Sequence, residues 1–132
     1  MKTSESEENY LEIILVLGML KPAVRSVDVA ERLNFKKSSV SVAMKNLRHK
    51  NYVKVSDEGY ITLTESGRKI AETIYERHQL VYERLVELGV NEKVAFEDAC
   101  KIEHRISAES FAAVKKHLEE KHWANKPEHK KD

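Results

Sequence analysis

The chain is poor in residues that cross-link loops or interrupt helices. Its 132 residues include one cysteine, two prolines and four glycines. The single cysteine, Cys100, excludes a disulfide within the chain and is compatible with a reducing compartment. No apolar run approaches the ~20 residues of a membrane span, and no basic leader precedes an apolar stretch. We therefore expect a mainly helical, cytoplasmic protein of one domain or two small ones.

The charged residues are segregated along the chain, although the net charge is only +1. Residues 5–12 contain four glutamates and no base, whereas residues 36–56 contain no acid. The lysines and arginines of the second segment are Lys36, Lys37, Lys45, Arg48, Lys50 and Lys54. Only this segment has the charge that a surface in contact with phosphate groups requires.

The spacing of apolar residues predicts helices, with a single change to the period of a β-strand. The expected helices span residues 5–20, 27–33 with Ser26 as the N-cap, 37 or 38 to 47, 67–88, 91–105, and 108 to about 121 with Ser107 as the N-cap. Two short β-rich runs between residues 52 and 63 predict a hairpin. Gly89 is expected to close the long fourth helix. The polar tail beyond the last helix is predicted to be disordered.

Three helices followed by a hairpin are the element order of a winged helix-turn-helix module. Its third helix would enter the major groove of double-stranded DNA, where short serines permit close approach and bases reach phosphates or guanine edges. The predicted DNA-binding residues are Lys36, Lys37, Ser38, Ser39, Ser41, Lys45, Arg48 and, in the wing, Lys54. A lysine-rich face alone is usually only a solvated surface. Here, however, the acid-free segment coincides with the elements that such modules use for contact.

A second pattern lies on the helix expected over residues 91–105. Cys100, Glu103 and His104 are spaced i, i+3 and i+4, so their side chains should project from one helical face. Sulfur, oxygen and nitrogen donors can bind a first-row divalent metal, with further ligands supplied by other helices. The further candidates are His78 on the long helix, and Asn9 with Glu12 on the first. Spacing alone leaves equally open a structural role, as a surface pair beside a buried cysteine.

Several segments resemble the diphtheria toxin repressor family of metal-dependent transcriptional regulators, specifically its short branch, which includes the manganese transport regulators. The segments that carry the resemblance are Glu8–Glu12, Ser38–Val40, Leu63–Gly67, Arg77–His78 and Ala99–Ser107. The resemblance implies a winged helix at residues 1–70, a helical metal-binding and dimerisation domain at 71–122, and a tail at 123–132. It also implies metal-dependent repression of uptake genes. The long branch adds an SH3-like domain, for which this chain has no residues.

The resemblance implies a hybrid set of metal ligands. The set is Asn9, Glu12, His78, Cys100, Glu103 and His104. Asn9 stands where the manganese regulators carry aspartate, and Cys100 stands where they carry glutamate, as in the iron-sensing branch. A soft thiolate disfavours Mn(II) and suits Fe(II), Co(II), Ni(II) or Zn(II). Among these metals the resemblance implies Fe(II), with Mn(II) as the alternative.

The iron branch also has an ancillary metal site, and the resemblance places its residues at Tyr82 and Phe96 here. Neither side chain is a good ligand, so this site is not expected in its usual form. Glu12, His78 and Glu103 offer another set of donors for a second ion.

These patterns predict a homodimer on a palindromic operator. Bound metal would restrict its two reading heads to the ~34 Å separation of successive major grooves. One alternative is a winged-helix regulator with a non-metal signal. Another is a small metal-dependent hydrolase with Glu103 as general base. The chain has neither a glycine-rich phosphate loop nor a nucleophile motif, so we expect no enzyme, no membrane partner and no small organic substrate.

Overall fold

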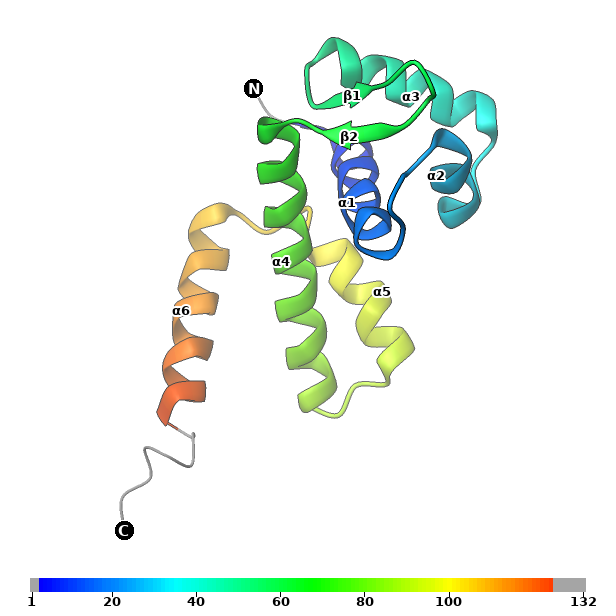
Figure 1. Cartoon of the computed structure of the whole chain (residues 1–132). Coiled ribbons are helices and arrows are strands. Elements are labelled where there is room, and N and C mark those ends of the chain that lie inside the picture. Colours follow the sequence, from blue (N-terminus) through cyan, green and yellow to red (C-terminus); the bar gives the residue numbers. More distant parts are fainter. Residues whose placement is uncertain (1–2, 125–132) are drawn as a thin grey trace. The chain divides into compact units, whose positions relative to one another are not determined.

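The computed structural model describes residues 3–124, which form six helices and a two-stranded sheet (Figure 1). The chain divides into two compact units, Met1–Glu76 and Arg77–Asp132. The elements are α1 (Glu5–Leu20), α2 (Ser26–Leu33), α3 (Lys37–His49), β1 (Val53–Val55), β2 (Ile61–Leu63), α4 (Glu65–Glu87), α5 (Glu92–Ile102) and α6 (Ala108–Ala124). The expected mainly helical fold, with a hairpin after the third helix, is confirmed. Residues 125–132 of the predicted tail lie outside the described residues.

The first unit packs α1, α2 and α3 around one apolar core. Leu11 on α1, Val29 on α2 and Val40 on α3 are fully buried. Met44 and Leu47 follow Val40 at helical spacing and are also buried, so α3 has one inward face. Each large apolar side chain in such a core contributes roughly 1.5–3 kcal/mol relative to an exposed position. The opposite face of α3 is therefore left to solvent.

The start of α1 is fixed both locally and by α3. Ser4 is the N-cap: its hydroxyl oxygen accepts from the Glu7 amide at 3.1 Å, while the Glu7 carboxylate accepts from the Ser4 amide at 3.0 Å. Lys50, just after α3, donates to the same carboxylate at 2.5 Å. This ion pair holds the pKa of Glu7 below its ordinary value, with the amide hydrogen bond from Ser4 as the next cause. Glu7 thus links the start of α1 to the end of α3.

The predicted N-cap of the second helix is one residue too late. Ser26 is the first residue of α2, and Arg25 occupies the N-cap position. The Asp28 carboxylate accepts from the Arg25 amide at 2.9 Å and from the Lys21 ammonium group at 2.5 Å. Asp28, the third residue of α2, therefore binds the amide of the N-cap residue, as the acid of a capping box does.

The wing is a short antiparallel hairpin attached closely to the start of α4. Val53 pairs with Leu63 and Val55 with Ile61. The Thr64 hydroxyl oxygen accepts from the Gly67 amide at 3.1 Å and donates to the carbonyl of Asn51 at 2.8 Å. A Cβ at Gly67 would lie 2.0 Å from the main-chain oxygen of Tyr52, so only glycine fits at this point.

The second unit is formed by the C-terminal part of α4 with α5 and α6. Gly89, with φ 99°, follows α4 as predicted. Asn91 caps α5 by accepting from the Lys93 amide at 2.9 Å, and Ser107 accepts from the Ser110 amide at 3.0 Å at the start of α6. Helix α6 continues to Ala124, three residues beyond its predicted end. None of the described helices is long and apolar enough to cross a membrane.

Candidate metal centre and nucleic-acid interface

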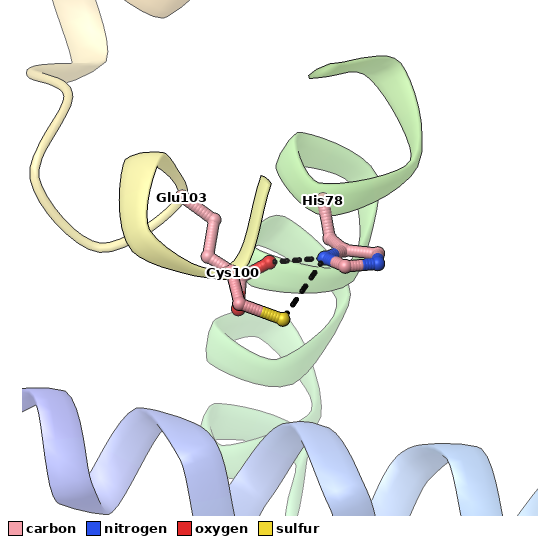
Figure 2. Close-up of side chains that lie close together, drawn as sticks. All are labelled: His78, Cys100 and Glu103. Atoms are coloured by element: carbon pink, nitrogen blue, oxygen red, sulfur yellow. Dashed lines mark hydrogen bonds and ion pairs between the residues drawn. The ribbon is translucent and has the colours of Figure 1, made fainter. Parts of the chain in front are cut away.

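Helices α4 and α5 bring three different donor atoms together in the second unit (Figure 2). His78 is on α4, Cys100 is on α5, and Glu103 is the C-cap residue directly after α5. The His78 Nδ1 atom lies 3.0 Å from Glu103 Oε2 and 3.7 Å from the Cys100 sulfur. One donor atom from each of these residues lies within 4.8 Å of the others. Nitrogen, oxygen and sulfur donors at this spacing fit a first-row divalent metal.

The carboxylate of Glu103 lies between two imidazoles. Its Oε1 atom is 3.1 Å from His104 Nε2, while its Oε2 atom faces His78. The Glu103 side chain is fully buried, and the His104 side chain is 2% exposed. A buried carboxylate costs several kcal/mol unless a positive or hydrogen-bonding group faces it. The two imidazoles supply such groups, and all three side chains are of the kinds that ligate metals.

The predicted helix over residues 91–105 is too long. Helix α5 ends at Ile102; Glu103 keeps helical dihedral angles as its C-cap, and His104 lies in the turn that follows. The cause is a contact from another helix. Arg77 on α4 donates through Nη1 to the main-chain oxygens of Glu103 and Ile106, both at 3.3 Å. The Glu103 carbonyl at the end of α5 and the Ile106 carbonyl just before α6 are thereby satisfied.

Aromatic rings surround the imidazole of His78. Tyr82 lies parallel to it, with ring centroids 6.2 Å apart, and Phe96 meets it edge-on at 4.7 Å. These are the two positions at which the resemblance placed the ancillary metal site. Here they form an apolar wall that limits the orientations of the His78 ring. The wall is a packing feature and adds no strong ligand to the cluster.

The six predicted ligands thus come from two parts of the chain. His78, Cys100, Glu103 and His104 belong to the second unit, where the structure brings them together. Asn9 and Glu12 are on α1, in the first unit. Asn9 is exposed and Glu12 is half-buried. Sequence reasoning gave Arg77 no role, because its partners are main-chain atoms 26 and 29 residues away.

In the first unit, the predicted DNA-binding residues are all exposed. They are Lys36, Lys37, Ser38, Ser39, Ser41, Lys45 and Arg48 beside or on α3, and Lys54 on β1. The inward positions of the same helix are apolar and buried. Val42 is a further residue on the exposed face, with 61% of its surface accessible, and sequence reasoning did not single it out. Val42 lies three residues from both Ser39 and Lys45, and this helical spacing would have predicted its place on the same face.

A winged helix joined to a helical unit with a metal-type donor cluster defines a class of metal-responsive DNA-binding regulators. Family models match nearly the whole chain: "iron dependent repressor, N-terminal DNA binding domain" at residues 2–60 and "iron dependent repressor, metal binding and dimerisation domain" at residues 64–131. The chain belongs to the iron dependent repressor family, a family of metal-dependent transcriptional regulators.

Individual relatives agree with this assignment. An uncharacterized HTH-type transcriptional regulator of Methanocaldococcus jannaschii is 38% identical over 118 residues, covering 88% of this chain and 94% of the relative. The transcriptional regulator MntR of Salmonella typhimurium is 33% identical over 106 residues, covering 80% and 68% of the two chains.

Solved structures are similar over the same region. A manganese-dependent transcriptional repressor in complex with manganese has a TM-score of 0.76 and 29% identity, covering 85% of this chain. The match spans 52% of that repressor, so this chain corresponds to about half of its length. A hypothetical protein from Sulfolobus solfataricus, 22% identical with a TM-score of 0.66, shares the fold over 88% of this chain and 89% of its own.

Proposed function

We propose that this protein is a transcriptional repressor that binds a palindromic operator as a homodimer when loaded with a divalent metal, Fe(II) in preference to Mn(II). The observation that carries the proposal is the presence, on one chain, of a nitrogen–oxygen–sulfur donor cluster with a buried histidine and glutamate and a half-buried cysteine, and of an exposed basic helix with a wing. Family membership supports the DNA, metal and dimer components. Control of metal uptake genes is the biological role that fits this combination.

The preference for Fe(II) rests on the Cys100 sulfur. It lies in the same cluster as the His78 nitrogen and the Glu103 carboxylate. A thiolate favours Fe(II) over Mn(II), which binds more readily to carboxylates, carbonyls and water. His104, which faces the same carboxylate, is proposed as the fourth ligand. Asn9 and Glu12 on α1 complete the proposed set, because they belong to the Glu8–Glu12 segment that resembles the family.

Mn(II) is the second candidate, and a specific similarity favours it. The repressor solved with manganese is 29% identical to this chain, and the structure of the manganese regulator SloR matches with a TM-score of 0.76 at 25% identity. Both candidates give the same DNA-binding face, so the metal preference can be measured independently of the operator.

The protein's own residues suggest why metal and DNA binding would be coupled. Glu103 has its buried carboxylate between two imidazoles. A divalent ion would be coordinated jointly by this carboxylate, the Cys100 thiolate and the imidazoles, and its positive charge would offset the negative charge of the first two. Binding therefore favours the conformation in which these side chains converge. We infer that this conformation is the one with high affinity for the operator.

The test is binding of anaerobically purified protein to its own promoter region at fixed salt, with Fe(II), Mn(II), Zn(II) or no metal. Tight binding with Fe(II) alone would support the full proposal, whereas tight binding with Mn(II) would favour the second candidate. Equal affinity without metal would contradict metal control and leave a winged-helix regulator with another signal. Lys45→Ala and Arg48→Ala are controls for the DNA face: both should weaken binding and reduce its salt dependence without changing metal affinity.

A further inference from the structure

Val42 is an apolar residue at the centre of a polar helix face. It is 61% exposed, while the buried side of α3 is filled by Val40, Met44 and Leu47. Ser39 and Lys45 lie one turn before and after it, and both are exposed. Because three other residues fill the core, Val42 contributes little to the packing of α3. Its branched side chain is instead presented to whatever contacts this face.

The partner proposed for this face has one apolar group that a valine can recognise. In the major groove, base edges present hydrogen-bond donors and acceptors, and only thymine adds a methyl group. Serine side chains at positions 38, 39 and 41 are short, so the helix can approach the bases closely. Lys45 and Arg48, with longer side chains, can reach phosphates to either side. Val42 lies between these serines and these two basic residues along α3, so it would be left opposite the base edges.

We propose that Val42 determines operator specificity by packing against the 5-methyl group of a thymine in each half-site. The inference rests on the proposed function, since it requires α3 to lie in the major groove. Valine forms no hydrogen bond, so it cannot favour guanine, adenine or cytosine through their polar edges. Cytosine, which lacks the methyl group and presents an amino donor instead, is disfavoured at this position.

The methyl group itself can be removed in a direct test. Operator sites are first selected from randomised DNA with the Mn(II)- or Fe(II)-loaded protein, and each thymine is then replaced in turn by uracil. Uracil keeps base pairing and lacks only the methyl. For the wild type we expect one position per half-site at which uracil lowers affinity by about four-fold, the value of burying one methyl-sized group. Uracil at both half-sites of a palindrome should lower affinity roughly ten-fold or more.

Val42→Ala should abolish this sensitivity and relax the preference for thymine over cytosine at the same position. Its matched control is Met19→Ala, which removes an equally exposed apolar side chain (59%) from α1 in the same unit and should leave uracil discrimination intact. Both variants should unfold at wild-type temperatures, because neither residue is in the core.

Three outcomes are informative. A uracil effect in the wild type and the Met19 variant that is absent from the Val42 variant supports the inference. Indifference of the wild type to uracil at every position, with sequence-specific, metal-dependent binding intact, overturns the inference and leaves the proposed function standing. Failure of the loaded protein to enrich any sequence overturns the proposed function, and the role of Val42 with it.

Discussion

Arg77 donates a hydrogen bond to the main-chain carbonyl of Glu103 at 3.3 Å. This contact positions the backbone at the end of α5, from which the candidate metal ligands Glu103 and His104 extend. The same guanidinium group lies 5.4 Å from the centre of the Phe111 ring on α6. One residue of α4 therefore contacts the turn that carries Glu103 and His104 and also the helix that follows. His78, the next residue along α4, faces the Glu103 side chain. Two consecutive residues thus fix both the backbone and the carboxylate of one proposed ligand.

Replacing Arg77 should weaken the metal centre without removing a ligand. Arg77→Ala leaves two carbonyl groups without their donor, and we expect a loss of about 1–3 kcal/mol in stability. Metal affinity should fall about ten-fold or more, as for other residues that orient ligands. Arg84→Ala is the control, because Arg84 lies on the same helix and pairs with the exposed Glu87 at 2.6 Å. Thermal unfolding and Co(II) titration of both variants provide the measurements; equal effects would contradict the role of Arg77.

Cys100 should determine which metals bind tightly. Cys100→Ser keeps the size of the side chain and replaces a soft donor by a hard one, so affinity for Co(II) and Zn(II) should fall about ten-fold or more, and affinity for Mn(II) much less. The Co(II) complex should also lose its near-ultraviolet thiolate-to-metal absorption. His117→Ala, at an exposed position on α6, should change neither property. A Co(II) spectrum that is unaltered in the serine variant would remove Cys100 from the ligand set.

Two glycines should respond oppositely to alanine. Gly67→Ala would place a Cβ 2.0 Å from the Tyr52 carbonyl oxygen, so the wing and the start of α4 must move apart; we expect a loss of at least about 2 kcal/mol. Gly18 is in helix α1 with nothing within 4 Å of the added Cβ, and Gly18→Ala should stabilise the protein by roughly 0.5–1 kcal/mol. Chemical denaturation of both variants checks the pair. A tolerated alanine at position 67 would show that the close approach to Tyr52 is not required.

The ion pair between Glu7 and Lys50 should give the first unit a pH-dependent component of stability. The pKa of Glu7 is lowered in the folded protein, so its contribution is present above the pKa of the unfolded chain and is lost as pH falls through the folded value. Glu7→Gln retains a capping side chain and removes the charge, and should cost up to about 1 kcal/mol at neutral pH and low salt. The difference from wild type should disappear in acid and shrink in high salt. A difference that persists at low pH would assign the effect to capping alone.

The sequence was most informative where local pattern decides the structure. The apolar period of α1 and α3 follows directly from the side chains that fill the core, such as Leu11 and Val40, and the change of period marks the wing. The last residue of α5 could not be predicted in this way, because Arg77, from a different helix, donates to the Glu103 carbonyl at its end and to the Ile106 carbonyl beyond it. The N-cap of α2 was misplaced because the helix begins one residue earlier, where the Asp28 carboxylate accepts from the amide of the N-cap residue Arg25.

The donor cluster was predictable in composition and less so in geometry. The spacing of Cys100, Glu103 and His104 suggested one helical face, whereas the structure places His104 in a turn and still directs it at the Glu103 carboxylate. The approach of His78 across the helix pair depends on tertiary packing, including Tyr82 and Phe96, and no spacing in the sequence encodes it.

The division of α3 into a buried side and an exposed side makes this protein suitable for grafting. Val40, Met44 and Leu47 anchor the helix from within, so the outward positions can be exchanged as a set without redesigning the fold. A chimera that keeps these three anchors and takes its exposed α3 residues from a relative should acquire the operator of that relative while keeping its own sensor unit. Such an exchange would give a family of orthogonal genetic switches that share one input and read different promoters.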